Sequence, residues 1–494
     1  MKHLIISAIT AAACLTAAAQ NERVHVFRSD KNFSTFKGSQ VESIIYSEGT
    51  DGFTKMNVTG TDGSVSTITL SAIDSVTVRQ TGLPEIYVNL IDYPDLTDLI
   101  KNPPTYTKET IYQAKLRIEG NGMMDDLDEL QVEFRGRGNS TWNMAKTPYR
   151  FKMAKKKSLA GMPKAKTFAL IANYIDCSLM RNAVALWTAR YLEMPYANHC
   201  VPVVVYLNGH YKGQYMMTEK IGIGGGSVDI DEYKGMLFEI DSNYDEDFRF
   251  VFNLSNYTTS QPSGSPFSGK SYLPVMVKDP DLTEIVDSLG TTTTAYFNMW
   301  KEDFAEMLKA VMSTPATGSL HEYIDLESAA NFYIVNSLAC NHEMQHPKSF
   351  YIHKTTIDDV YHWGPVWDFD WAFTFDGAEG ASATVPLVNS NGDCGGYTFL
   401  SALFKNVEFR KIYKEKWDKF VSEGYPKLLQ YMEEYANTIE PSAKENGLLW
   451  PADYSVSWRR SESSFNFRDN YKALKKWLEE RVAYCNSDPN FGIY

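Results

Sequence analysis

One candidate for chemistry is a pair of histidines that flank a glutamate. The stretch from His342 to His346 reads His-Glu-Met-Gln-His, which is the H-E-x-x-H spacing of zinc proteases. Zinc binding needs both histidines on one helical face, and Pro347 disfavours helical backbone at His346. No further histidine follows at the metzincin spacing. A zinc protease therefore stays open as an alternative, but the spacing alone does not establish one.

A second candidate is a pair of carboxylates in an apolar, aromatic segment. Residues 363–373 read WGPVWDFDWAF, and in an extended strand Asp368 and Asp370 would point to the same side. Two such carboxylates repel each other and are costly to desolvate unless a cation joins them. Carboxylates together with substrate phosphates are the ligands that Mg²⁺ prefers. The pair therefore predicts a metal site, the alternative being that one aspartate caps a turn while the other pairs with a Lys or Arg.

The third candidate is a positive stretch in an acidic chain. No acidic residue occurs between Asn143 and Ile175. The stretch carries these cationic residues: Lys146, Arg150, Lys152, Lys155, Lys156, Lys157, Lys164 and Lys166. We expect Lys155 to Lys157 to be a solvated face. Lys152 differs, because it lies in the predicted strand YRFKM directly after the Gly-rich turn RGRGNSTW, whose glycines let the backbone approach a phosphate closely.

Length, composition and the N-terminal residues indicate which class of protein carries these candidates. A chain of 494 residues with 44% hydrophobic residues can form more than one domain, and a net charge of -13 argues against a nucleic-acid partner. Residues 1–19 combine a basic start, an apolar run and small residues, which predicts a secretory signal peptide and no transmembrane segment in the mature chain. We expect a secreted or cell-envelope protein, with lipid attachment at Cys14 as the weaker option. The remaining five cysteines are scattered, which predicts buried thiols with at most one bridge.

The pattern of apolar residues predicts an α+β protein. Residues 22–80 alternate apolar and polar in short runs between turns and predict a small all-β domain. Strands dominate residues 84–245, with hairpins around RGRGNSTW and around the LNG turn, and one helix near 179–192. Residues 246–494 comprise a connecting loop and a helix-rich part, in which Asp325 is the expected N-cap of a helix.

The order of several motifs resembles one family. The chain carries in succession RGRGNSTW, KTPYRFKM, SLAGMPKAKTFALIANYIDCSLMRN, YLNGHYKGQYMMTEKI and GPVWDFDWAF. Together these blocks resemble the spore-coat protein H (CotH) kinase family over roughly residues 84–494. The resemblance implies a divergent two-lobed protein-kinase-like fold that uses ATP with Mg²⁺ or Mn²⁺ to phosphorylate Ser or Thr of a protein substrate, such as a surface or coat protein.

The resemblance also implies a nucleotide-binding side. It places Arg137, Asn139 and Ser140 of the Gly-rich turn near the phosphates, together with Lys152. Glu219, in the strand after the LNG turn, would pair with that lysine. These five residues are the expected ATP-binding set.

On the metal side the resemblance implies that Asp368 binds the metal, with Asp370 beside it. Glu343 stands where the family has its catalytic aspartate, and Lys348 stands where an ordinary kinase has a metal-binding Asn. Glu is one methylene longer than Asp, and a displaced catalytic base lowers the rate of transfer. A catalytically silent kinase-fold adhesin is therefore the second alternative, and a zinc protease the third.

Overall fold

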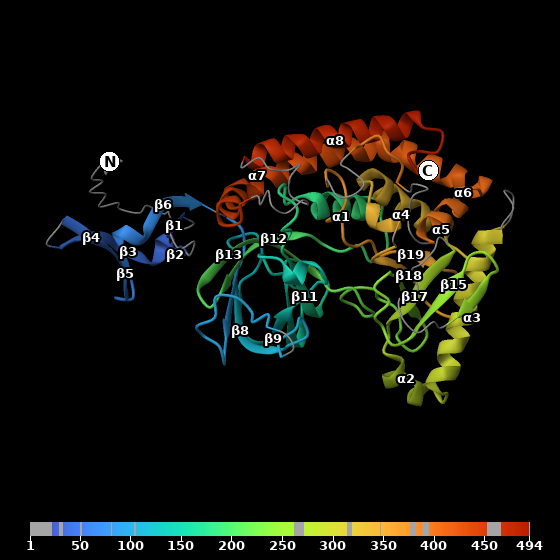
Figure 1. The fold of residues 1–494 in the computed structure, drawn as a ribbon, viewed down its shortest axis with the longest axis horizontal. Helices are drawn as coiled ribbons and strands as arrows, with labels where there is room; N and C mark the ends of the chain where they lie inside the picture. The colour runs from blue at the N-terminus through green and yellow to red at the C-terminus, as the bar shows by residue number, and fades with distance from the viewer. Residues whose placement is uncertain are drawn as a thin grey trace.

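The computed structural model describes most of the chain. It covers residues 22–28, 33–49, 52–80, 82–102, 105–260, 271–313, 319–345, 347–375, 382–387, 395–451 and 466–493. The predicted signal peptide, Cys14, His346 and Cys394 lie outside these residues. Figure 1 shows three structured parts in chain order, namely an N-terminal β region, a barrel and a C-terminal part rich in helices.

The N-terminal β region consists of two three-stranded sheets with the orders β2-β1-β6 and β3-β4-β5. The strands are β1 (Glu22–Arg28), β2 (Phe33–Lys37), β3 (Val41–Gly49), β4 (Gly52–Gly60), β5 (Val65–Thr69) and β6 (Ile73–Gln80). Val26, Met56 and Val58 belong to its small core, which the alternating sequence pattern supplies. The prediction of an all-β region over residues 22–80 is confirmed.

The barrel is closed and has the strand order β10-β11-β13-β12-β7-β8-β9. Its strands are β7 (Glu85–Leu90), β8 (Tyr112–Glu119), β9 (Leu127–Gly136), β10 (Tyr149–Lys157), β11 (Ala165–Ile171), β12 (Val201–Leu207) and β13 (His210–Glu219). Apolar side chains at alternate positions, such as Phe134, Tyr149 and Phe151, fill its interior. Both predicted hairpins are confirmed, since β9 pairs antiparallel with β10 and β12 with β13.

The C-terminal part contains a second sheet with the order β16-β15-β17-β14-β18-β19. Its strands are β14 (Met236–Ile240), β15 (Arg249–Asn253), β16 (Thr258–Ser260), β17 (Tyr272–Asp279), β18 (Phe350–Lys354) and β19 (His362–Trp363). Strand β14 pairs with β17 and β18, so the chain passes from barrel to second sheet between Glu219 and Met236.

Helices complete the fold. They are α1 (Arg181–Tyr191), α2 (Leu282–Leu289), α3 (Thr293–Ser313), α4 (Leu326–Ala339), α5 (Gly396–Leu403), α6 (Val407–Lys419), α7 (Tyr425–Leu449) and α8 (Phe467–Ser487). Although α1 falls between barrel strands in the sequence, it packs on α4 and α7 (Figure 1). The chain is thus a mixed α and β protein that begins with an all-β region. Within the described part of the chain no helix is long and apolar enough to span a membrane, and Cys200, Cys340 and Cys485 are free thiols.

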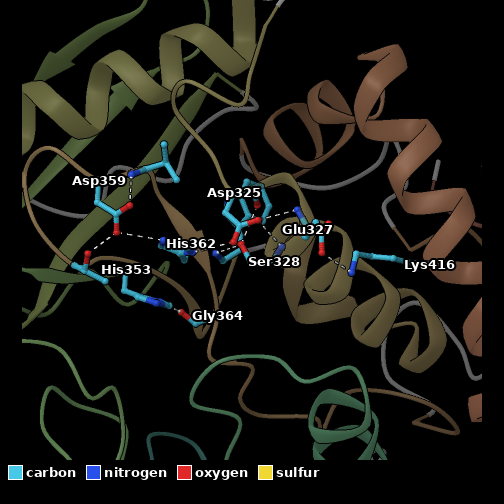
Figure 2. A network of polar contacts seen from close by, with 11 residues as sticks. Asp325, Glu327, Ser328, His353, Asp359, His362, Gly364 and Lys416 are labelled. Carbon is cyan, nitrogen blue, oxygen red and sulfur yellow. Dashed lines mark hydrogen bonds and ion pairs between the residues drawn. The ribbon is translucent and has the colours of Figure 1, made fainter.

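A polar network ties the start of α4 to β19 (Figure 2). Asp325 caps α4 as predicted, because its carboxylate accepts hydrogen bonds from the N–H groups of Glu327 (2.9 Å) and Ser328 (3.2 Å). The ring of His362 lies between two carboxylates, with Nδ1 3.1 Å from Asp325 and Nε2 3.3 Å from Asp359. The network therefore fixes β19 on α4 immediately before the loop that carries Asp368.

Candidate functional site

A cavity of about 590 Å³ lies where the barrel, α1 and the C-terminal part meet. The end of β9, the Gly-rich turn and β10 line it on the barrel side. Trp367, Asp368 and Asp370 also line it, all from residues 364–370, which we call the Asp368 loop, as do residues of the turn that follows α4. Segments far apart in the sequence thus build one site, and charge divides it into two walls.

Three arginines form the wall on the barrel side. Arg135 and Arg137 come from the end of β9 and the turn, and Arg150 comes from β10; we call them the arginine wall. Burial and the neighbouring Arg150 lower the pKa of Arg135 to about 10. Burial and the neighbouring Arg137 likewise lower the pKa of Arg150. Cations that are buried together and repel one another form a favourable site for an anion.

The two glycines of the turn serve different purposes. A Cβ on Gly136 would lie 1.9 Å from the indole ring of Trp142. Only glycine therefore lets the backbone pack directly against this ring. Gly138 has a φ of +86°, which a residue with a side chain rarely adopts. The glycines therefore shape the turn that carries Arg137, whose guanidinium lies 5.4 Å from the centre of the Trp367 ring.

The structure places the other predicted phosphate-binding residues unequally. Asn139 and Ser140 line the cavity at its exposed rim. Lys152 does not line it; its side chain is 47% exposed and lies 3.7 Å from the Glu133 carboxylate. Arg150 occupies the same face of β10 two residues earlier and does reach the cavity. The alternation in β10 was therefore predicted correctly, but the cation that faces the cavity is Arg150.

The predicted pairing of Lys152 with Glu219 is wrong. Strand β11 lies between β10 and β13, so the strands that carry the two residues are not neighbours. Glu219 is instead 3% exposed and bound to His199, whose N–H donates to Oε2 (2.9 Å) and whose Nδ1 lies 2.5 Å from Oε1. Glu219 does not line the cavity. Its role is to hold the entry into β12.

Asp368, Asp370 and Glu343 form the second wall, which we call the carboxylate wall. All three line the cavity. The segment around Asp368 is not a strand as predicted: it lies outside the sheets, and Asp368 itself has a φ of +62°. Burial and the nearby Asp368 raise the pKa of Asp370 to about 7. Burial also raises the pKa of Asp368, although Arg137 opposes that shift.

Two residues of α1 that the sequence analysis did not single out hold the carboxylate pair. The amide nitrogen of Asn182 donates to Oδ1 of Asp370 (2.8 Å), and its amide oxygen accepts the N–H of Phe369 (3.1 Å). The guanidinium of the fully buried Arg181 donates to the carbonyl oxygen of Asp370 (2.7 Å). Both residues end the block SLAGMPKAKTFALIANYIDCSLMRN, and no local signal in it indicates a contact with Asp370.

Glu343 enters the cavity from a tight turn. Helix α4 ends at Ala339, Cys340 adopts a left-handed φ of +44°, and a short 3-10 turn follows at His342–Gln345. Glu343 is buried, and its Oε2 has no hydrogen-bond partner among the described residues. Burial and the charge of Asp368 raise the pKa of Glu343 well above its usual range, while Lys348 opposes the shift.

The same turn does not have the geometry of a zinc-protease helix. His342–Gln345 forms one 3-10 turn rather than an α-helix, and Nε2 of His342 lies 3.9 Å from Sγ of Cys340. His346 is outside the described residues. Within the ranges that the structure describes, no three His, Cys, Asp or Glu side chains form a group that could hold a metal by themselves.

Comparison with known proteins identifies one family. A family model described as CotH kinase protein matches residues 133–485, which is more than half of the chain. The match begins within β9 and ends within α8, so it includes both walls of the cavity and excludes the N-terminal β region. A search of curated proteins returns no match.

Proposed function

The chain belongs to the CotH kinase family, and from that premise we propose that it transfers the γ-phosphoryl group of ATP to a Ser or Thr hydroxyl of a protein. Family membership supports a kinase-like function in general. The reaction, the use of Mg²⁺ or Mn²⁺, a divergent two-lobed kinase fold and action outside the cytoplasm are parts of our proposal. The barrel would correspond to the smaller lobe, and the C-terminal part to the larger lobe.

The observation that carries the proposal is that three arginines and three carboxylates line one cavity. The arginine wall offers positive charge to phosphate oxygens. In the carboxylate wall, burial and the nearby Asp368 raise the pKa of Asp370 to about 7, so a cation bound there would favour the ionised pair. A bound metal–nucleotide complex carries both complementary charges, so it would relieve both walls at once.

The residues fit the cofactors that the family implies. Asp368 and Asp370 would hold Mg²⁺ or Mn²⁺, while Arg137 and Arg150 would contact phosphate oxygens. Two carboxylates are sufficient for such an ion, because Mg²⁺ usually completes its shell with water and substrate phosphates. When bound, the ion would neutralise charge on the phosphates.

Glu343 is the residue that could accept the proton of the substrate hydroxyl. Its unpartnered Oε2 belongs to a side chain that lines the cavity. The hydroxyl oxygen would form a bond to the γ-phosphorus as the bond to the bridging oxygen breaks, with ADP as the leaving group and the proton going to Glu343. Nearby Lys348 favours the ionised carboxylate, which a base requires.

A specific observation also favours a second candidate, a silent kinase-fold binding protein of the cell surface. Burial keeps the pKa of Glu343 well above its usual range, which disfavours its action as a base at neutral pH. Lys348, at the sequence position where an ordinary kinase has a metal-binding Asn, has its ammonium 3.5 Å from Asn243 Oδ1. Such a protein would keep the cavity but lack transfer.

The test is a thermal-shift experiment on the mature protein with ATP plus Mg²⁺ or Mn²⁺, with ATP alone, and with Zn²⁺ alone. Ligands that bind only the folded state raise the apparent stability. We expect stabilisation only when metal and ATP are both present, and phosphate transfer from ATP to casein. Metal–ATP stabilisation without transfer would favour the silent binding protein. Stabilisation by Zn²⁺ alone that disappears in His342→Ala would contradict both.

A further inference from the structure

Asn182, near the start of α1, has every polar atom of its amide engaged. Its nitrogen donates to Asp370 Oδ1 (2.8 Å) and to Asn173 Oδ1 (3.1 Å), and its oxygen accepts the N–H of Phe369 (3.1 Å). An amide group has two N–H donors and one acceptor oxygen, so both donors are used and the oxygen accepts one hydrogen bond. A rotated amide would set its oxygen against two acceptors. Its orientation is therefore fixed.

Arg181 grips the same loop from the preceding position. Its guanidinium donates to the carbonyl oxygen of Asp370 (2.7 Å), and its main-chain N–H donates to Oδ2 of Asp176 (2.9 Å). Asp176 also accepts hydrogen bonds from the N–H (2.9 Å) and hydroxyl (2.5 Å) of Ser178. The start of α1 is thus anchored in its own turn before it holds the loop.

The Asp368 loop depends on such side-chain contacts because it lacks strand pairing. Residues 364–369 have neither helical nor strand structure. Phe369 is fully buried in the main core and anchors the middle of the loop. The packing of Phe369 sets the position of the backbone, but it does not orient the carboxylate next to it. A directional hydrogen bond to that carboxylate does.

We propose that Asn182 is a positioning residue for the metal-binding carboxylates. By holding Oδ1 of Asp370 and the N–H of Phe369 together, it directs the remaining oxygen of Asp370 and the carboxylate of Asp368 toward one ion. This inference rests on the proposed function for the identity of the ion, but the hydrogen bonds are independent of it. Loss of a residue that hydrogen-bonds to a metal ligand typically lowers metal affinity by about 10–100-fold.

The chain offers a matched control in α4. Asn331 is 7% exposed and Asn182 is 5% exposed, and the amide nitrogen of Asn331 donates to the carbonyl oxygen of Leu192 (3.0 Å). Asn331 does not line the cavity. Replacing either asparagine with alanine removes a buried amide from a helix. Asn331→Ala therefore controls for the loss of a buried amide, whereas Asn182→Ala alone should affect the loop.

The experiment titrates Mn²⁺ in the presence of a non-hydrolysable ATP analogue and follows thermal stabilisation. For Asn182→Ala we expect the half-saturating Mn²⁺ concentration to rise about tenfold, and for Asn331→Ala to stay within about twofold of wild type. Asn182→Ser, which is polar but too short to reach Asp370, should behave like Asn182→Ala and covers the case in which the alanine variant fails to fold. Equal titrations for wild type and both Asn182 variants would overturn the proposal.

Hydrogen exchange separates this inference from the proposed function. Loss of Asn182 should speed exchange of the amides at Phe369 and Asp370, and Asn331→Ala should leave them unchanged. If wild type shows no stabilisation by metal and nucleotide, the proposed function fails and the metal-positioning role fails with it, even where exchange confirms the contact. If wild type binds metal and nucleotide but exchange in the loop is unaffected by Asn182→Ala, the positioning role alone is overturned.

Discussion

The two walls of the cavity are built in opposite ways. The arginine wall stands on the paired strands β9 and β10, where main-chain hydrogen bonds determine which side each residue faces. The carboxylate wall stands on the Asp368 loop and a 3-10 turn, where Cys340 and Asp368 have left-handed backbones. On that wall, hydrogen bonds from α1 side chains hold the loop in place of main-chain strand pairing. One wall is therefore positioned by main-chain pairing and the other by side-chain hydrogen bonds.

The largest effect should come from the carboxylate wall. Asp368→Asn keeps the shape of the side chain but removes a charged oxygen ligand, so phosphate transfer should fall by about a thousandfold or more. The fold should be retained, because the change also relieves repulsion with Asp370. The measurement is transfer from ATP to casein together with apparent stability without ligand. Asp358→Asn, in an exposed loop, is the control and should have no effect.

Glu343 tests whether the same wall also supplies the base. Glu343→Gln removes the acceptor of the proton and should lower transfer by about a hundredfold or more, while metal–ATP stabilisation persists. Glu343→Asp restores the residue of the family and should retain or raise transfer. Transfer at the wild-type rate by Glu343→Gln would contradict the assignment. Absence of transfer from wild type and Glu343→Asp, despite nucleotide binding, would favour the silent binding protein.

The arginine wall should respond less strongly, because several cations share the phosphates. Arg150→Ala removes one charged contact and should weaken the binding of Mg-ATP by about tenfold. Lys152→Ala changes the same face of β10 two residues farther on and should alter binding by less than about twofold, because that side chain points to solvent. Isothermal titration calorimetry measures both. Equal losses would mean that the stretch acts as a diffuse positive field.

The sequence predicts regular elements well where one periodicity dominates. The strand YRFKM, in which alternation puts Tyr149, Phe151 and Met153 on one face, was correctly predicted, and so was Asp325 as a helix cap; that this face fills a barrel was not predicted. The strand β14 is buried throughout, and its sequence MLFEI gave no alternation that could assign it to either sheet. Long-range pairing with β18, far along the chain, decides its place.

The site was predicted in composition but only partly in geometry. The sequence grouped Arg137, Asp368 and Glu343 through the resemblance, and the structure places all three in one cavity. The sequence analysis selected Lys152 instead of Arg150. Alternation of side chains along β10 shows which face both residues share, but not where along the strand the cavity begins. The sequence analysis also missed Asn182, because nothing local to α1 reveals a contact with Asp370, 188 residues away.

The stability of the folded chain should depend on pH through the buried carboxylate of Asp370. Burial and Asp368 raise the pKa of Asp370 from its usual 3.8 to about 7. Below pH 3.8 the group is protonated in both folded and unfolded chains, so its contribution to stability is fully present. Between pH 3.8 and 7 the unfolded chain releases the proton while the folded chain retains it, and stability is lost. Asp370→Asn, still able to accept the hydrogen bond from Asn182, removes this loss.

Urea unfolding without metal at pH values of about 4, 5 and 7 measures the effect. Relative to wild type, Asp370→Asn should gain roughly 2 to 4 kcal/mol between the lowest and highest pH, since one pKa unit corresponds to about 1.4 kcal/mol. Asp358→Asn should follow the wild-type profile. A parallel profile for Asp370→Asn would mean that the carboxylate pair carries no uncompensated charge. The contrast between the walls would then lose its electrostatic basis, because the carboxylates would already be satisfied without a cation.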